Sequence, residues 1–395
     1  MKMKRLAGAC ALVLALAGMA DEAAARKAET ARLQGEIDRV SAQGGGRVVI
    51  EKGVHPCGTL YLKSNVELHL EEGAELRGGP KPADYDDAIP TYEVYTYKGA
   101  VPATVTRKAF IYAENATNIA ITGKGTINGV GQNFFDQRTW AKPTKTLRPR
   151  MVVFMKCKGI RFADTTFKDS PVWTMWLRRC EDVVVSRIRI DADQRMINTD
   201  GIDFDACRRV RVGDSSFSTG DDCVVLRAIR HACDTEEAVS EDTIVSNCTF
   251  STTCQGVRIV CPSDHVIRNA VFRDISFKGR NAIFADQQRW YLEEGNTGNI
   301  ATSDFLFENW TIDCYGLPIS VCVTDGVTLR DFGHMTFRNI AIKSKNPVKI
   351  CGNGTTVVKD VVLENVTGKI LANPPVVTQR TEGLRVSGRG LSTNP

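Results

Sequence analysis

Short runs of β-branched and aromatic residues return along this chain at a nearly constant interval, and this repetition limits the folds available to it. From about residue 110 onward, the runs alternate in polarity and are separated by Asn, Asp and Gly. Alternation with a period of two is typical of strands, and an interval of roughly 20–30 residues is typical of one coil of a solenoid. Examples are segments 118–122, 159–162, 182–185, 209–212, 265–272 and 304–310.

A ladder of small residues strengthens this interpretation. Cys157, Cys180 and Cys207 each stand three residues before an apolar strand residue, and Ala116 has the same phase before Ile119. Equivalent positions of stacked coils lie above one another, so these side chains are expected to form a buried column. A Greek-key sandwich also has many short strands but does not explain the repeated phase. The sequence therefore predicts an all-β fold, a single-stranded right-handed parallel β-helix, as one domain over residues 21–395.

Residues 21–43 have a different pattern. Apolar residues among charged neighbours predict an amphipathic helix of about six turns, ended by the three glycines at 44–46. Because a solenoid exposes its core at its ends, we expect this helix to cap the first coil, the alternative being a solvated linker helix. The apolar positions are Ala23, Ala24, Leu33, Ile37 and Val40.

Residues 1–20 are predicted to be a signal peptide, so the protein is expected to be secreted or periplasmic. Lys2, Lys4 and Arg5 precede an apolar stretch and a small-residue cleavage site at 18–20. The stretch is too short to span a membrane, so no membrane insertion is expected. Cys10 offers a weak alternative as a lipid attachment site.

Charge and cysteine content restrict the partners. Loss of the three basic residues with the signal peptide lowers the formal net charge from +5 to +2, which does not favour nucleic-acid binding. We expect a monomer.

In an oxidising compartment, disulfides are the usual state of cysteine, and Cys233 is a candidate for pairing. The three ladder cysteines are instead expected to be buried free thiols.

Two acidic motifs stand about one repeat apart. The first is Asn198-Thr199-Asp200-Gly201 and the second is Gly220-Asp221-Asp222-Cys223. On adjacent coils, with strands about 4.8 Å apart, the three carboxylates would share one patch. Such crowding raises at least one pKa, which supplies an acid beside ionised neighbours, as glycosidic hydrolysis requires. Either motif alone is more typical of a turn, and an Asp cluster also suits calcium.

The chain resembles the polygalacturonases, the pectin-degrading glycoside hydrolases of family 28. The resemblance includes both acidic motifs and segments 41–50, 62–73, 123–129 and 169–174. It implies a right-handed β-helix and inverting hydrolysis without a metal or other cofactor. By motif, Asp221 would be the general acid, Asp200 and Asp222 would activate water, and Asn198 would help to fix the site.

Two family motifs are missing downstream. Where Gly-His-Gly is usual, the chain has Cys254-Gln255-Gly256, so Cys254 or Gln255 replaces the histidine. The Arg-Ile-Lys expected to hold a sugar carboxylate is also absent. Arg258 and Arg227 are candidate replacements, the alternative being solvated strand charges.

Further candidate site residues lie near these motifs. Arg289 is a further substrate-binding candidate, in a loop where Trp290 could stack on a sugar. His265 is a weaker candidate for a displaced catalytic histidine. Trp173 and Trp176 are expected to be core residues.

The leading hypothesis is therefore an exported, inverting hydrolase acting on pectic poly- or oligosaccharides. Because the Arg-Ile-Lys motif is absent, the bond cut need not join two galacturonates. A calcium-dependent polysaccharide lyase and a non-catalytic glycan-binding β-helix are the alternatives. Segments 84–98 and 229–242 are predicted to wall off one end of a groove, which would favour cutting from a chain end.

Overall fold

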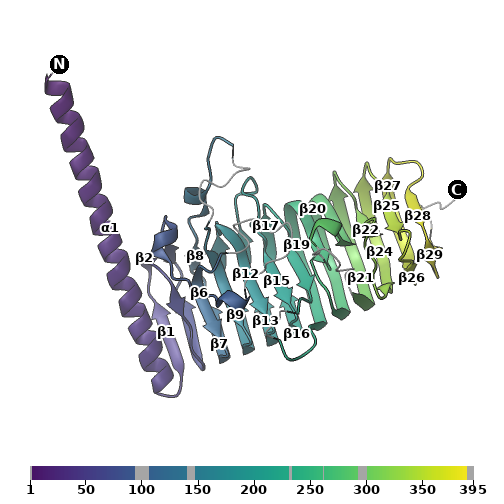
Figure 1. Ribbon diagram of the computed structural model, residues 1–395, viewed down its shortest axis with the longest axis horizontal. Helices are drawn as coiled ribbons and strands as arrows, with labels where there is room; N and C mark the ends of the chain where they lie inside the picture. Colours follow the sequence, from purple (N-terminus) through teal and green to yellow (C-terminus); the bar gives the residue numbers. More distant parts are fainter. Residues whose placement is uncertain are drawn as a thin grey trace.

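The computed structural model describes residues 2–93, 106–139, 147–230, 234–260, 262–291 and 300–388. Its named strands pair in parallel, and 27 of them join one continuous sheet that coils around an apolar core. The result is a right-handed parallel β-helix with one helix at its N-terminal end (Figure 1). The predicted fold class is confirmed.

The first face of the β-helix carries the strands that lead out of the two acidic motifs. Successive strands on this face hydrogen-bond in register from one coil to the next, because each coil repeats the same alternation. They are β3 (Leu60–Tyr61), β6 (Ala109–Glu114), β9 (Arg150–Met155), β12 (Val172–Arg178), β15 (Ile202–Asp205), β18 (Val224–Arg227), β22 (Ile319–Val323), β25 (Val348–Cys351) and β28 (Val376–Gln379).

The second and third faces complete each coil. The second face contains β1 (Gly46–Ile50), β4 (Val66–Leu70), β7 (Thr117–Thr122), β10 (Lys158–Ala163), β13 (Glu181–Ser186), β16 (Arg208–Gly213) and β30 (Arg385–Ser387). The third face contains β2 (Gly53–Cys57), β5 (Ala74–Gly78), β8 (Thr126–Asn128), β11 (Thr166–Lys168), β14 (Arg189–Asp191) and β17 (Ser216–Thr219).

Toward the C-terminus the strands become longer and bend from one face to the next. β19 pairs with β16, β17 and β18, and thus contributes to all three faces. The long strands are β19 (Val239–Ile259), β20 (Val266–Gln287), β21 (Ala301–Cys314), β24 (Met335–Ser344) and β27 (Val362–Ile370). A small separate sheet comprises β23 (Phe332–Gly333), β26 (Val358–Lys359) and β29 (Thr381–Glu382), and the loops contain the short 3-10 turns η1 (Pro82–Asp84), η2 (Thr91–Glu93), η4 (Gly131–Phe134) and η5 (Arg289–Tyr291).

The predicted cysteine column is present. Glu181 N donates to Cys157 O and Arg208 N donates to Cys180 O, so Cys157, Cys180 and Cys207 stack on successive coils. Each is at most 1% exposed. The ten cysteines that the structure describes with their side chains are free thiols, and Cys233 lies outside the described residues. Buried thiols here fill space as small apolar groups.

The N-terminal helix caps the β-helix as predicted, but it is longer than expected. α1 (Lys2–Ala42) continues through the segment expected to be cleaved. Leu33, Ile37 and Val40 are buried against the first coil, which excludes the linker alternative, whereas Ala23 and Ala24 are exposed. Its end is satisfied by Gly45 N, which donates to Val40 O in a left-handed turn. Within the described residues, no helix combines the length and apolarity that a membrane span needs.

Candidate active site

The two acidic motifs occupy equivalent turns, where the chain passes from the third face to the first. Gly201 N donates to Asp222 O (2.8 Å) and Ile202 N donates to Cys223 O (3.0 Å), so Asp200 and Asp222 lie in register on adjacent coils. Both are 3% exposed, while Asp221 is half-buried. The structure therefore brings together the three carboxylates that the sequence singled out.

Glycine is required where the second turn crosses the first. A Cβ at Gly220 would collide with the carbonyl oxygen of Met196. Gly220 N donates to Thr199 Oγ1 (2.9 Å), and that hydroxyl in turn donates to Met196 O (2.9 Å). These contacts lock the motifs together, so the position of Asp221 depends on the first motif as well as on its own.

Asn198 supports Asp221 directly. Its backbone N and its Nδ2 both donate to Asp221 Oδ2, at 3.2 and 3.3 Å. Asn198 has a φ of 59°, a left-handed conformation that Asn tolerates better than most residues. The double contact orients the Asp221 carboxylate.

Burial and mutual repulsion change the protonation of the cluster. Burial, followed by the charge of Asp221, raises the pKa of Asp200 well above its usual value. The same two causes raise the pKa of Asp222 to about 7, against an opposing effect from Arg258. The cluster therefore retains a proton close to neutral pH, as the crowding argument predicts.

The two candidates for the histidine position lie on different sides of the cluster. Gln255 lies in the column of Asp200 and Asp222, since Cys223 N donates to Gln255 O (2.9 Å) and Gln255 N donates to Asp222 Oδ1 (3.2 Å). With its amide nitrogen facing Asp222, its oxygen accepts from Arg258 Nη1 (3.2 Å). The Cys254 thiol lies beside Asp221 and Asp222, and burial raises its pKa so that it stays protonated.

Arg258 borders the acidic patch, as its strand position predicted. Its Nε lies 3.9 Å from Asp222 Oδ2, and its guanidinium lies 5.7 Å from the centre of the Phe284 ring on the next coil. The residue is 8% exposed, which excludes the solvated alternative. Its charge also acts on Asp286, whose pKa is raised by burial.

Arg227 belongs to a buried layer beneath the acids. Its Nη2 pairs with Asp203 Oδ1 (2.9 Å), and its guanidinium lies 4.6 Å from the centre of a Trp173 ring. Trp173 and Trp176 form an apolar cluster there, and Arg150 stacks on both, so the expectation that these tryptophans are core residues is confirmed. At 4% exposure, Arg227 is not a solvated strand charge.

Two residues of this region escaped the sequence analysis. Asp203 is fully buried on β15, and burial raises its pKa to about 6 against the charge of Arg227. Arg148 donates from Nη2 to Asn198 Oδ1 (2.9 Å) and from Nη1 to Ile197 O (2.9 Å). The alternation along β15 could have revealed Asp203. Arg148 lies 50 residues from its partner and outside any repeat, so the pattern gave no signal for it.

The remaining candidates lie apart from the carboxylates. Arg289 begins η5, immediately beyond β20, and its side chain lies near Gly326. His265 Nδ1 contacts Asp264 Oδ1 (2.6 Å), and its backbone N donates to Ala228 O, so it is tied to a turn at the far end of β18.

One group suited to a metal occurs among the described residues. Ligand atoms of Asp221, Asp222 and Cys254 lie within 4.8 Å of one another. Calcium prefers six to eight oxygen ligands, whereas this set includes a protonated thiol and is bordered by Arg258. These donors therefore do not fit the calcium site that a lyase would need.

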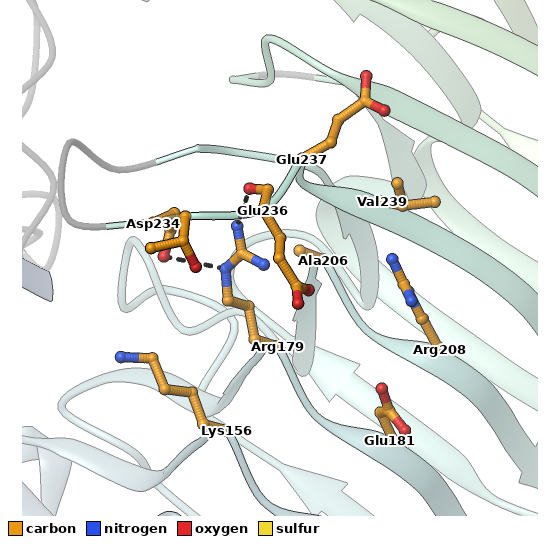
Figure 2. Close-up of a pocket in the computed structure, with 10 residues that line it drawn as sticks. Lys156, Arg179, Glu181, Ala206, Arg208, Asp234, Glu236, Glu237 and Val239 are labelled. Carbon is orange, nitrogen blue, oxygen red and sulfur yellow. Dashed lines mark hydrogen bonds and ion pairs between the residues drawn. The ribbon is translucent and has the colours of Figure 1, made fainter.

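The two loop segments predicted to flank the groove meet at a buried arginine. Arg178, the last residue of β12, pairs through Nε with Glu93 Oε2 (2.6 Å) and through Nη2 with Asp234 Oδ2 (2.8 Å). A cavity of about 300 Å³ lies beside this network, and Figure 2 shows Arg179 reaching Asp234 and the backbone of Glu236 across it. Parts of both segments, 94–98 and 231–233, lie outside the described residues.

Residues 95–236 match the model of glycosyl hydrolases family 28. A polygalacturonase of Persea americana is 33% identical over 125 residues, 31% of this chain and 27% of its own length. The aligned segments cover 27–52% of the length of seven plant relatives that the chain matches.

Solved structures support the fold. An exopolygalacturonase from Thermotoga maritima superposes with a TM-score of 0.66 at 18% identity, covering 89% of this chain and 86% of that one. A polygalacturonase from Erwinia carotovora ssp. carotovora gives a TM-score of 0.60 at 17% identity, with 93% of each chain covered.

Proposed function

We propose that this protein is a glycoside hydrolase that cleaves O-glycosidic bonds of pectic poly- or oligosaccharides with inversion of configuration. The observation that carries the proposal is the stacking of Asp200 on Asp222 with Asp221 beside them, in a cluster that keeps a proton near neutral pH. Inverting hydrolysis needs one carboxyl group that gives a proton and one that takes a proton.

In this proposal Asp221 is the general acid. It is the most exposed of the three, and Asn198 fixes its orientation by two hydrogen bonds. The proton that the cluster retains passes to Asp221, which gives it to the glycosidic oxygen as the bond from that oxygen to the anomeric carbon breaks, and Asp200 and Asp222 are left ionised. Asp200 and Asp222 take a proton from the water that attacks the anomeric carbon from the opposite side.

Arg258 is proposed to bind the carboxylate of the sugar at the cleavage point. A guanidinium binds carboxylates through paired, charge-assisted hydrogen bonds, and Arg258 already lies at the border of the cluster. Gln255 orients both Asp222 and Arg258 in this scheme. Arg227 acts from beneath through Asp203, and Arg289 binds a more distant part of the substrate.

Export and a monomeric state complete the proposal. The basic start and small-residue cleavage site of residues 1–20 support secretion or transfer to the periplasm. Mass spectrometry of protein recovered from outside the cytoplasm would locate the cleavage, and light scattering would give the oligomeric state. An uncleaved chain retained in the cytoplasm would contradict the export proposal.

The test of function is anomeric NMR during hydrolysis of defined pectic oligosaccharides. We expect products whose new reducing ends have the inverted configuration, and we expect Asp221→Asn to lose about 10²–10⁴-fold in kcat while its unfolding midpoint is unchanged or higher. Retention of configuration would contradict the mechanism. A calcium-dependent rise in absorbance from a new double bond would indicate a lyase, and glycan binding without cleavage by the wild type would indicate a binding protein.

A further inference from the structure

A second hollow begins beside the acidic turns and continues over the C-terminal coils. This groove has a volume of about 790 Å³, and its near end is formed by Thr252 and Thr253. Thr252 Oγ1 donates to the carbonyl oxygen of Asp221, and Thr253 Oγ1 donates to that of Gly220 (3.3 Å). The groove is therefore continuous with the peptide that carries the proposed general acid.

Lysines are spaced along this groove by the coil repeat. Register pairs Ser251 with Lys278, Lys278 with Asp313, Asp313 with Lys343, and Lys343 with Lys369. At about 4.8 Å per coil, Lys278 and Lys369 are separated by roughly 14 Å along the β-helix axis.

The balance of charge in the groove is positive. Asp313 is its one acidic lining residue and pairs with Lys343 (2.9 Å). Lys345 also lines the groove, and Lys278, Lys345 and Lys369 are exposed with no ion-pair partner in the part of the chain that the structure describes. Unpaired lysines on one line favour a ligand with repeated negative charges.

Apolar surface lies among these charges. Tyr315 and Leu371 are 60% and 59% exposed and line the same groove, together with the aliphatic stems of the lysines. Sugar rings present C–H groups on their faces and charged or hydroxyl groups at their edges. An exposed tyrosine ring between lysines fits such a ligand better than it fits a compact anion.

We propose that this groove binds an extended anionic oligosaccharide, one bearing carboxylates on successive sugars, as the continuation of the chain being cut. The inference rests on the proposed function for the identity of the substrate. It adds that the protein holds the substrate over several coils on the C-terminal side of the acids, through Lys278, Lys369 and Tyr315. Substrates too short to reach Lys278 do not use these contacts.

The test compares Lys278→Gln/Lys369→Gln with Lys168→Gln. Lys168 is an exposed lysine in the same register column but on the N-terminal side of the acids, outside the groove. With oligogalacturonates of increasing length, we expect the double variant to raise KM about three- to tenfold for long substrates and to leave KM for the shortest substrate and kcat unchanged. Added salt should reduce the difference in KM between the wild type and the double variant for long substrates, and Lys168→Gln should have the KM of the wild type.

Binding measurements separate failure of this inference from failure of the proposed function. With Asp221→Asn protein, calorimetric affinity for a long oligogalacturonate should fall in the double lysine variant. Equal affinities with and without the two lysine substitutions, together with normal hydrolysis by the wild type, would contradict glycan binding in the groove and leave the proposed function intact. If binding of the oligogalacturonate depends on the two lysines but the wild type does not hydrolyse it, the proposed hydrolase function is contradicted and glycan binding by the groove stands. Lysine-dependent binding to anionic lipid vesicles but not to oligogalacturonate would overturn the groove as a glycan site.

Discussion

Two buried charge clusters lie on the first face of the β-helix, and they differ in how far their charges are neutralised. At the end of β12, Arg178 lies between Glu93 and Asp234, with Lys156 and Arg179 as further partners, and the shortest contact is 2.6 Å. At the start of β15 and β18, three carboxylates gather, and the ion pair that the described residues offer them is the 3.9 Å contact from Arg258 to Asp222.

This difference separates a structural network from a chemical site. Where cations match the acids at short range, the ion pairs fasten two loops to the end of β12. In the acidic cluster, burial and repulsion between carboxylates outweigh the attraction of the surrounding arginines, so the pKa of Asp200 and of Asp222 is raised and a proton is kept in the cluster. Both arrangements cost desolvation energy, but only the second leaves groups able to transfer protons.

The largest expected effect comes from breaking the cluster around Arg178, called the balanced cluster because its cations match its acids. Arg178→Met leaves Glu93 and Asp234 buried with less compensation, and we expect a loss of about 3–5 kcal/mol in the free energy of unfolding. Denaturant unfolding monitored by tryptophan fluorescence measures it. Arg209→Gln is the matched control, because Arg209 also bridges two carboxylates but its side chain is 43% exposed, and its loss should cost at most about 1 kcal/mol. Equal losses in the two variants would contradict the structural role of burial.

The sequence predicted the acidic cluster but not the balanced one, and the reason is the repeat. Stacked coils preserve phase, so two motifs one repeat apart must meet, and the cysteine ladder follows from the same rule. Glu93, Arg178 and Asp234 come from a loop, a strand end and another loop, whose packing leaves no periodic trace. The helix was predicted to begin at residue 21, but α1 begins at Lys2. The residues before position 21 also favour helix, so the apolar pattern alone does not set the first residue of the helix.

An intermediate effect should follow when the acidic cluster loses its bordering cation. Arg258→Gln removes a charge that lowers the pKa of Asp222, so that pKa should rise further and the acidic limb of the pH–kcat/KM profile should move to higher pH. We also expect kcat/KM on uronate-containing substrates to fall about tenfold, because the sugar carboxylate loses its partner. Arg258→Lys keeps the charge and should restore the position of the limb better than the affinity. If the acidic limb of the profile stays at the same pH in Arg258→Gln, Arg258 does not influence the titration of the acidic cluster.

The smallest effect concerns the dependence of stability on pH. The folded pKa of Asp222, about 7, lies above its ordinary value of 3.8, so the folded state binds more protons than the unfolded state between these pH values. Its contribution to stability is therefore greatest below about pH 4 and is lost as the pH rises through about 7. Asp222→Asn removes this titration, and unfolding free energies at pH 5 and pH 8 should differ less in the variant than in the wild type. Asp182→Asn is the control, because the hydrogen bond from Arg209 lowers the pKa of Asp182 and this carboxylate does not titrate between pH 5 and pH 8. The difference between the two unfolding free energies should stay as in the wild type, and a smaller difference in this variant would contradict the assignment of the titration to Asp222.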